Sequence, residues 1–404
     1  MNLLPEGMEN GAVIKTQLSR KLTVDGITQA YPVYKVRLDL LYYNDQNDRI
    51  ATWISEYKSR PGSVALNLDN RTVYNAVIED FIVKSNPEAI RKTQTNIELV
   101  DQREPGVVLL DGRVIDGNRR FACLRRLSEN NDKFNYFETI ILDRNIENSA
   151  KQIKMLELSI QHGEESKVDY NPIDRLVGIY NDVIDTKLLS AAEYARSANE
   201  QLQEVNRRIE IANLMIEFLE FINAPLQFHV ARDMQVYTPI EALLPLLKKC
   251  RTEDDAEDVK ISVFTNLLMR SEGDMRQFVR SLKNIVGSDY QAGFIEEQKE
   301  IAAKVVEALP PVGYVTDRII RDVIRANDEI VQELGNSLDK AMMKVKKTET
   351  RNRPVLLIEK ATELLESMDM NILKKLNDSD IQRIGRQLGR LESVIEEIRG
   401  GLND

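Results

Sequence analysis

Short stretches in the first third of the chain alternate hydrophobic and polar residues, which is the pattern of strands that bury one face. Residues 30–43 (AYPVYKVRLDLLYY) and 137–143 (FETIILD) are predicted strands. Between them, Asp111-Gly112 separates two short β-rich runs. This dipeptide favours a type I′ hairpin turn, because both central residues of that turn need a positive φ.

Helical spacing of hydrophobic residues interrupts these strands. The stretch 47–60 predicts a helix with Trp53 on its hydrophobic side. The stretch 72–85 predicts a second helix, because its hydrophobic residues recur at steps of three and four. The buried positions expected for this second helix are Val73, Ala76, Val77 and Phe81.

Beyond Pro172 the hydrophobic spacing is helical throughout, as in the long stretch 202–222. Breaks are expected at 186–190 (TKLLS) and after this long stretch, at Asn223-Ala224-Pro225. From residue 236 onward only helices are expected, separated by breaks such as 309–315 (LPPVGYV) and 351–354 (RNRP).

This change of pattern predicts the fold class and the domain organisation. An α+β N-terminal domain is expected over residues 1–148, followed by a mainly α-helical remainder. The helical remainder is expected to comprise a middle domain over 149–235 and a C-terminal domain over 236–404.

The last helix carries a regular hydrophobic seam with spacings of 3, 4, 3, 4 and 3, which is the a/d pattern of a coiled coil. The seam is shorter than three heptads, so a helix packed within a bundle and a dimeric coiled coil both remain open. We therefore expect a homodimer, or a protein partner, at the C-terminal helices. The seam residues are Ile381, Ile384, Leu388, Leu391, Ile395 and Ile398.

Composition and charge limit the classes of protein to consider. The 404 residues carry a net charge of -10, which argues against a surface coated in basic residues for nucleic acid, although a local basic patch is compatible with it. No apolar run approaches the ~18 residues of a membrane span. The N-terminus lacks the basic and apolar regions of a signal peptide, so the expected compartment is the cytoplasm.

Cysteine and histidine are too sparse for most metal and disulfide architectures. Cys123 and Cys250 lie far apart and cannot make a disulfide framework or a Cys-rich zinc site. His162 and His229 are the only histidines, which argues against a His-rich metal site. Any metal ligands therefore stay unknown at this stage.

The stretch 107–127 (VVLLDGRVIDGNRRFACLRRL) combines a strand, a glycine turn and an amphipathic helix with paired arginines. For a helix that begins near Arg119, at roughly 100° per residue, Arg120 falls in the middle of the hydrophobic face. A guanidinium is costly to bury unpaired. Arg120 therefore either points beyond the helix N-terminus, where an anion would bind, or pairs with an acidic residue of the domain while Asp116 or Asn118 caps the helix.

The motif VIDGNRRFACLRRL resembles the Gly-x-Arg-Arg motif of the ParB/sulfiredoxin-like superfamily. Gly117, Arg119 and Arg120 occupy the matching positions, and Asn118 occupies the variable one. The resemblance implies that this turn holds the phosphates of a nucleotide. In ParB partition proteins that nucleotide is CTP, which switches a dimer between loading on DNA and a closed sliding clamp.

Two flanking segments extend the resemblance to about residues 33–222. Asn47 and Arg49 match an Asn-x-Arg turn that follows an early strand of the family. The segment 158–176 (LSIQHGEESKVDYNPIDRL) is similar to a later box that ends in Asp-Leu-Asn-Pro-Ile-Glu. The resemblance thus adds Asn47 and Arg49 to the expected phosphate-binding residues.

The later box departs from the family where metal and triphosphate chemistry would lie. Leu158 and Ser159 stand where the family has Glu and Asn, and His162 stands in place of an Arg. Glu157 or Glu164 could replace the missing carboxylate. These two residues and His162 are therefore the candidate catalytic residues, with Mg²⁺ as the implied metal.

A helix-turn-helix is expected after this box, as in ParB proteins. Ala195, Asn199 and Val205 have the spacing of a small residue, a tight turn and a core aliphatic residue where two helices cross. Arg207 and Arg208 would lie on the second helix and contact DNA. A helical core without DNA-binding activity remains the alternative, because the region is acidic. The later basic run at 340–353 is either a nucleic-acid contact or a solvated linker.

These observations predict a nucleotide-dependent DNA-binding protein of the ParB type, with CTP as the first candidate. It would serve plasmid, phage or chromosome maintenance, or DNA modification or defence. Two alternatives remain open. One is an enzyme of the same fold, such as an NTPase, a phosphotransferase or a nuclease. The other is a protein that assembles partners and carries a regulatory nucleotide pocket.

Overall fold

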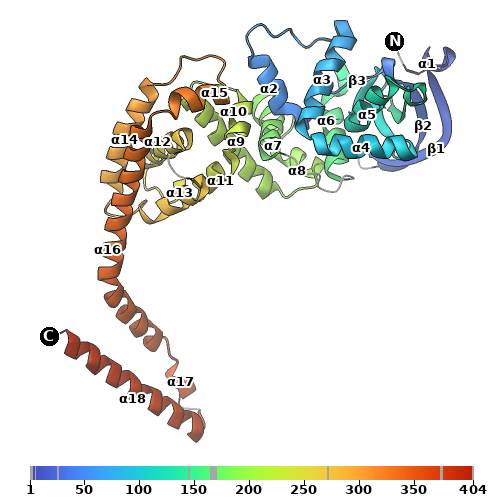
Figure 1. The fold of residues 1–404 in the computed structure, drawn as a ribbon. Helices are drawn as coiled ribbons and strands as arrows, with labels where there is room; N and C mark the ends of the chain where they lie inside the picture. The colour runs from blue at the N-terminus through green and yellow to red at the C-terminus, as the bar shows by residue number, and fades with distance from the viewer. Residues whose placement is uncertain are drawn as a thin grey trace. The chain divides into compact units, whose positions relative to one another are not determined.

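The computed structural model of the chain describes residues 3–4, 6–24, 27–143, 146–163, 171–270, 273–373 and 376–402 (Figure 1). Within these ranges, the side chains of 146–149, 161–163, 317 and 323 are outside the description. The chain divides into two compact units, Met1–Ala341 and Met342–Asp404. The expected boundaries near residues 148 and 235 both fall inside the first unit.

The first unit begins with a six-stranded mixed sheet of strand order β1-β2-β6-β4-β5-β3. The pairs β1–β2, β2–β6 and β4–β5 are antiparallel, whereas β4–β6 and β3–β5 are parallel. The strands are β1 (Val13–Val24), β2 (Ile27–Arg37), β3 (Tyr42–Tyr43), β4 (Gly106–Leu109), β5 (Arg113–Asp116) and β6 (Tyr136–Leu142). The sheet, followed by helices, confirms the predicted α+β class with a mainly helical remainder.

The strands differ from the prediction in two places. The stretch 30–43 forms part of β2 and the short β3, separated by a 3-10 turn at Leu38–Leu40. Alternation does not predict β1, because this strand lies at the edge of the sheet and its middle residues are exposed. The predicted hairpin at Asp111-Gly112 is confirmed, since it joins β4 to β5, but the turn is not type I′: Gly112 has a φ of +93°, whereas Asp111 is not among the residues with a positive φ.

Helices cover both faces of the sheet. Because successive strand residues point to opposite faces, neighbours such as Val107 and Val108 enter different cores. Val108 packs in a cluster with Phe121 of α5, whereas Val107 packs with Ile153 of α6. The helices of this region are α1 (Glu6–Glu9), α2 (Ala51–Ser59), α3 (Arg71–Ser85), α4 (Pro87–Val100), α5 (Asn118–Ser128) and α6 (Ile146–Gly163).

Helix α3 forms where it is predicted, but its buried face is rotated from the expected one. Val73, an expected core residue, is 51% exposed, whereas Asn75 is buried. The Asn75 side chain donates to the Leu41 carbonyl at 2.9 Å and accepts from the Tyr43 N–H at 3.1 Å. Those bonds satisfy backbone groups beside β3. A spacing count that treats asparagine as exposed misses this arrangement.

A helical array completes the first unit. The predicted breaks at 186–190, at Asn223-Ala224-Pro225 and at 309–315 are confirmed. The elements are α7 (Pro172–Ile179), the π-helix η5 (Tyr180–Asp185), α8 (Ala191–Ser197), α9 (Leu202–Phe221), α10 (Phe228–Asp233), α11 (Tyr237–Leu247), α12 (Glu253–Met269), α13 (Met275–Ser281), α14 (Gln291–Glu307), α15 (Asp317–Ile319) and the π-helix η7 (Ile320–Ile324).

The break predicted at 351–354 is wrong. Helix α16 (Asp328–Glu366) enters the second unit at Met342 and continues through Pro354, and this unit also contains α17 (Met370–Leu373) and α18 (Asp378–Gly401). A proline removes one helical hydrogen bond and bends the helix, yet a following run such as VLLIEKATELLE favours helix strongly enough to continue it. Among the described residues, no helix has the length and hydropathy needed to cross a membrane.

Candidate functional site

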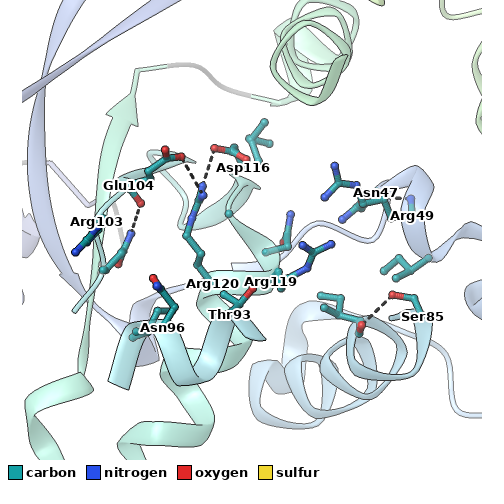
Figure 2. Close-up of a pocket in the computed structure, with 17 residues that line it drawn as sticks. Asn47, Arg49, Ser85, Thr93, Asn96, Arg103, Glu104, Asp116, Arg119 and Arg120 are labelled. Carbon is teal, nitrogen blue, oxygen red and sulfur yellow. Dashed lines mark hydrogen bonds and ion pairs between the residues drawn. The ribbon is translucent and has the colours of Figure 1, made fainter. Parts of the chain in front are cut away.

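A cavity of about 310 Å³ lies at the turn between β5 and α5 (Figure 2). Its walls come from the η2 turn (Asp48–Ile50), from α3 and α4, from residues 102–104 and from the β5–α5 turn itself. The fold therefore brings two predicted motifs, which are far apart in sequence, into one cavity. The predicted residues that line it are Asn47, Arg49, Gly117, Asn118, Arg119 and Arg120.

Gly117 shapes the turn at the centre of this cavity. Its φ is +90°, and a Cβ at this position would lie 2.9 Å from Cζ of Phe137 and 3.1 Å from Nη2 of Arg120. Gly117 is also the N-cap of α5, and no side chain caps this helix. The first N–H groups of a helix lack intrahelical acceptors and carry partial positive charge. That charge therefore lies in the cavity wall.

Arg120 lies over this turn rather than in a hydrophobic core. Its Nη2 donates to Oδ2 of Asp116 at 3.1 Å, and its Nη1 lies 3.6 Å from Oε2 of Glu104. Arg20 of β1 lies 3.4 Å from the same Asp116 carboxylate. The ion pair considered as one alternative for Arg120 is thus present. It lies in the cavity wall, so the guanidinium remains beside any bound molecule.

Two buried polar atoms of the turn make no hydrogen bond in the described structure, namely Oδ1 of Asn118 and Nε of Arg120. A buried polar atom without a partner costs about 1–3 kcal/mol. The first is an acceptor and the second is a donor. A ligand that carries hydroxyl groups and anionic oxygens would satisfy both.

The cavity is positively charged, in contrast to the chain as a whole. Four of its lining residues are arginines, namely Arg49, Arg103, Arg119 and Arg120, against the carboxylates of Glu104 and Asp116. With all of these groups ionised, the lining carries a formal charge of +2 on a chain of -10. Such a local reversal of sign favours an anionic ligand.

Asn47 has a structural part in this wall. Its Oδ1 accepts from the Arg49 N–H at 3.1 Å, which caps the η2 turn. The bond fixes the direction in which the chain leaves the turn. Asn47 thus helps to place Arg49, in addition to lining the cavity itself.

The part of the wall around α4 was not predicted from the sequence, because no helix was expected there. Thr93 and Asn96 of α4 and Arg103 of the following loop line the cavity. The loop is held by Gln102, whose side-chain amide donates to the Glu138 carbonyl at 2.7 Å and accepts from the Glu138 N–H at 2.9 Å. The spacing of three between Thr93 and Asn96 was the signal that could have placed both on one helix face.

Glu157, a candidate catalytic residue, lies outside the lining of this cavity. It is 2% exposed, and its Oε2 lies 3.7 Å from Nζ of Lys154. Burial raises the pKa of Glu157 to about 7, although the nearby ammonium of Lys154 opposes this rise. The carboxyl is therefore part of a buried ionic cluster of α6.

The other candidate catalytic residues cannot be placed. Glu164 lies outside the described residues, as does the side chain of His162. Within the described part of the chain, no group of three or more His, Cys, Asp and Glu residues is arranged to hold a metal ion.

Helices α8 and α9 are joined by a short turn and follow one another where helices were predicted. Ser190 and Glu193 make a capping box that starts α8, and Asn199 has a φ of +52° in the turn. Ala195 and Val205 are buried at the crossing, in the roles that their spacing predicts. The sequence therefore located this pair of helices correctly.

The two arginines predicted to contact DNA differ in their surroundings. Arg207 has a half-exposed side chain, and its Nη2 lies 3.1 Å from Oε1 of Glu241. Arg208 is mostly buried and pairs closely with Glu200, which also pairs with Arg175. Arg207 is thus the more accessible of the two, whereas the Arg208 guanidinium is engaged by Glu200.

Comparison with known proteins gives no independent assignment. No protein-family model matches the chain, and no curated protein is significantly similar to it. The resemblance to the ParB/sulfiredoxin-like superfamily therefore remains a prediction from the motifs.

Proposed function

We propose that the chain binds a nucleoside triphosphate in the cavity at the β5–α5 turn, with CTP as the first candidate. The observation that carries the proposal is the turn Gly117–Arg120. It combines a helix N-terminus that no side chain caps, a left-handed glycine and two unpartnered polar atoms in a positive cavity. Helix N-termini and arginines are common phosphate-binding elements.

The position of each group supports a particular use. Arg119, Arg120 and the first N–H groups of α5 would hold phosphate oxygens, and Arg49 would meet the same polyphosphate from the opposite wall. Asn118 would accept a hydrogen bond from a hydroxyl group. Thr93 and Asn96 of α4 would then contact the sugar or the base of the nucleotide.

Isothermal titration calorimetry against CTP, ATP, GTP and ADP, each with and without Mg²⁺, tests this proposal. Arg119→Ala should weaken binding of the preferred nucleotide about 10- to 100-fold, because one charge-assisted hydrogen bond contributes ~1.5–3 kcal/mol. Arg126→Ala is the matched control, since Arg126 lies on the same helix, is exposed and does not line the cavity. Equal affinity in Arg119→Ala and wild type would refute the assignment. Phosphate release in the same samples tests whether the chain is an NTPase.

DNA binding is a second proposal, and the α8–α9 arrangement supports it. Gln203, Asn206 and Arg207 are exposed on the first turns of α9. Asn and Gln pair with adenine and Arg pairs with guanine in the major groove. Because the region is acidic, affinity for DNA would depend on base contacts more than on phosphate attraction. Nucleotide-dependent DNA binding would combine this proposal with the first.

Self-association is a third proposal, and it concerns residues 342–404. Of the hydrophobic residues described in this unit, only Val345 is buried. On α18, Ile381, Leu388, Ile395 and Ile398 are between 39% and 51% exposed. Packing within this unit thus leaves four of the six seam residues exposed, which favours the dimeric coiled coil over a bundle formed within this unit. A protein partner with a similar seam is the alternative occupant.

A further inference from the structure

The turn that carries Asn47 and Arg49 has a second face, which is directed away from the cavity. Asp48 lies between these two residues but does not line the cavity, and it is 4% exposed. Its carboxylate packs against α7 so closely that a Cβ on Gly178 would lie 2.5 Å from Oδ2 of Asp48. In this short turn, Asn47 and Arg49 thus face the cavity, whereas Asp48 between them faces the helical array.

Lys154 of α6 binds the residues on this second face of the turn. Its Nζ donates to Oδ1 of Asp48 at 2.8 Å and to the Gln46 carbonyl at 3.2 Å. It also lies 3.3 Å from Oδ2 of Asp182, on η5. The ammonium is 3% exposed, so these oxygens replace its hydration shell. One side chain therefore fixes both the backbone and the acidic residue of the cavity turn.

The cluster contains more acid than base. Asp48, Glu157 and Asp182 face one lysine, which gives a formal charge of -2 when all four groups are ionised. Burial raises the pKa of Glu157 and of Asp182 to about 7 in each case, against the attraction of Lys154. Burial lowers the pKa of Lys154, but the attraction of Asp48 and the other two acids outweighs it and keeps the lysine charged.

Other polar groups complete the surroundings of the cluster. Asn44 bonds the Glu157 carboxyl, and Tyr194 of α8 is fully buried close enough to the cluster for its pKa to depend on it. Burial is the main cause that raises the pKa of Tyr194, and the charge of Asp48 adds to it. Burial is also the main cause that raises the pKa of Asp174 of α7, and the charge of Asp48 adds to this rise.

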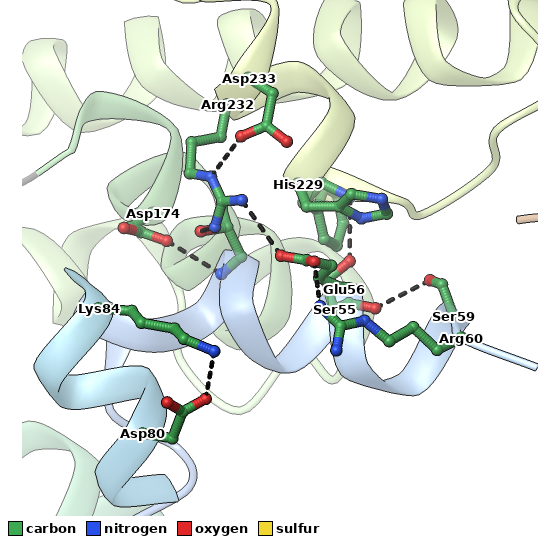
Figure 3. A network of polar contacts seen from close by, with 12 residues as sticks. Ser55, Glu56, Ser59, Arg60, Asp80, Lys84, Asp174, His229, Arg232 and Asp233 are labelled. Atoms are coloured by element: carbon green, nitrogen blue, oxygen red, sulfur yellow. Dashed lines mark hydrogen bonds and ion pairs between the residues drawn. The ribbon is translucent and has the colours of Figure 1, made fainter. Parts of the chain in front are cut away.

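The helix that follows the turn is also held by the helical array. Oδ1 of Asp174 accepts from the Thr52 N–H at 2.9 Å, and Arg232 of α10 donates to Oγ1 of Thr52 at 3.2 Å (Figure 3). The Arg232 guanidinium carbon lies 4.1 Å from the ring centre of Trp53. Trp53 is the only tryptophan of the chain, so its fluorescence reports on this junction.

We propose that Lys154 is a positioning residue, which holds the turn Asn44–Ile50 in the geometry that presents Asn47 and Arg49 to the ligand of the cavity. The consequence for ligand affinity rests on the proposed nucleotide function, whereas the effect on the turn itself does not. When Glu157 and Asp182 are ionised, they compete with Asp48 for the same ammonium and add negative charge behind the cavity wall. Ligand affinity should therefore fall as this acidic excess ionises.

Lys154→Met tests the proposal, with Lys151→Met as the matched control. Lys151 lies one turn earlier on α6, is partly exposed and pairs with Glu193 at the surface. Hydrogen exchange of residues 44–50 should become at least ~10-fold faster in Lys154→Met and stay unchanged in Lys151→Met, since the hold on Asp48 and Gln46 is lost. Affinity for the nucleotide that wild type prefers should weaken by ~10-fold or more, with partial rescue in Lys154→Arg.

A pH profile supplies a readout that a purely structural lysine would not change. Wild-type affinity should fall by ~10-fold between pH 6 and 8 relative to Glu157→Gln, with the nucleotide's own titration common to both proteins. If Lys154→Met fails to fold, this comparison of wild type with Glu157→Gln still tests the proposal. Parallel pH profiles, or exchange at 44–50 that is unchanged in folded Lys154→Met, would overturn the proposal. If wild type binds no nucleotide, the proposed function fails, while the exchange data and the Trp53 emission of Lys154→Met and Lys154→Arg still test the positioning.

Discussion

Replacing Glu157 with Gln should make the chain more stable at pH 8 and leave its stability at pH 5 nearly unchanged. Glu157 is 2% exposed, and burial raises its pKa from the ordinary value of 4.5 to about 7. Such a shift stabilises the folded state fully below pH 4.5, and this stabilisation is lost as the pH rises through about 7. At ~1.4 kcal/mol for each tenfold change in proton affinity, the loss amounts to ~3 kcal/mol.

Urea unfolding followed by Trp53 fluorescence, at pH values from 5 to 8.5, measures this effect. The free energy of unfolding of wild type should decline across the interval, whereas that of Glu157→Gln should decline less. The two proteins should differ by up to ~3 kcal/mol at pH 8. Glu204→Gln is the control, because Glu204 is exposed on α9. Equal destabilisation of Glu157→Gln at both ends of the interval would refute the reasoning and make Glu157 an indispensable ionic partner of Lys154.

Three further predictions concern the turn, the second helix of the α8–α9 pair and the C-terminal seam. Gly117→Ala should lower the melting temperature and abolish nucleotide binding. A φ of +90° costs alanine ~1 kcal/mol, and the added Cβ would clash with Phe137. An unchanged melting temperature would contradict this prediction. Arg207→Glu should eliminate binding to DNA duplexes in fluorescence anisotropy at low salt, and retained binding would move the contact to the 340–353 run. Leu388→Asp should reduce the mass seen by light scattering to that of a monomer, whereas a wild-type monomer would remove the need for a partner at the seam.

Local patterns predicted the elements that depend on local chemistry. Asp111-Gly112 predicted the β4–β5 hairpin because the turn needs a residue with a positive φ, which glycine adopts readily, although the turn that forms is not type I′. The α8–α9 pair followed from Ala195 and Val205 in the same way, since a crossing of two helices requires small and aliphatic residues at that spacing. The six residues of the two cavity motifs also line one cavity.

Features that depend on distant contacts escaped prediction. A lysine on an amphipathic helix is normally exposed, and Lys154 is buried only because Asp48 and Asp182 arrive from other elements. The contact between α2 and the segment before α10 is of the same kind, because Ser55 of α2 donates to the Leu226 carbonyl, far along the chain. Neither contact can be predicted from the spacing of hydrophobic residues along the sequence.

Hydrogen exchange with and without nucleotide tests the central claim most directly, because it locates the ligand on the chain. Exchange at Gly117–Phe121 and at Asn47–Ile50 should become at least ~10-fold slower when the preferred nucleotide is bound, since phosphate oxygens would accept from the first N–H groups of α5. The protection should disappear in Arg119→Ala and persist in Arg126→Ala. Saturating nucleotide that protects other segments, or none, would contradict the claim that this cavity is a nucleotide site.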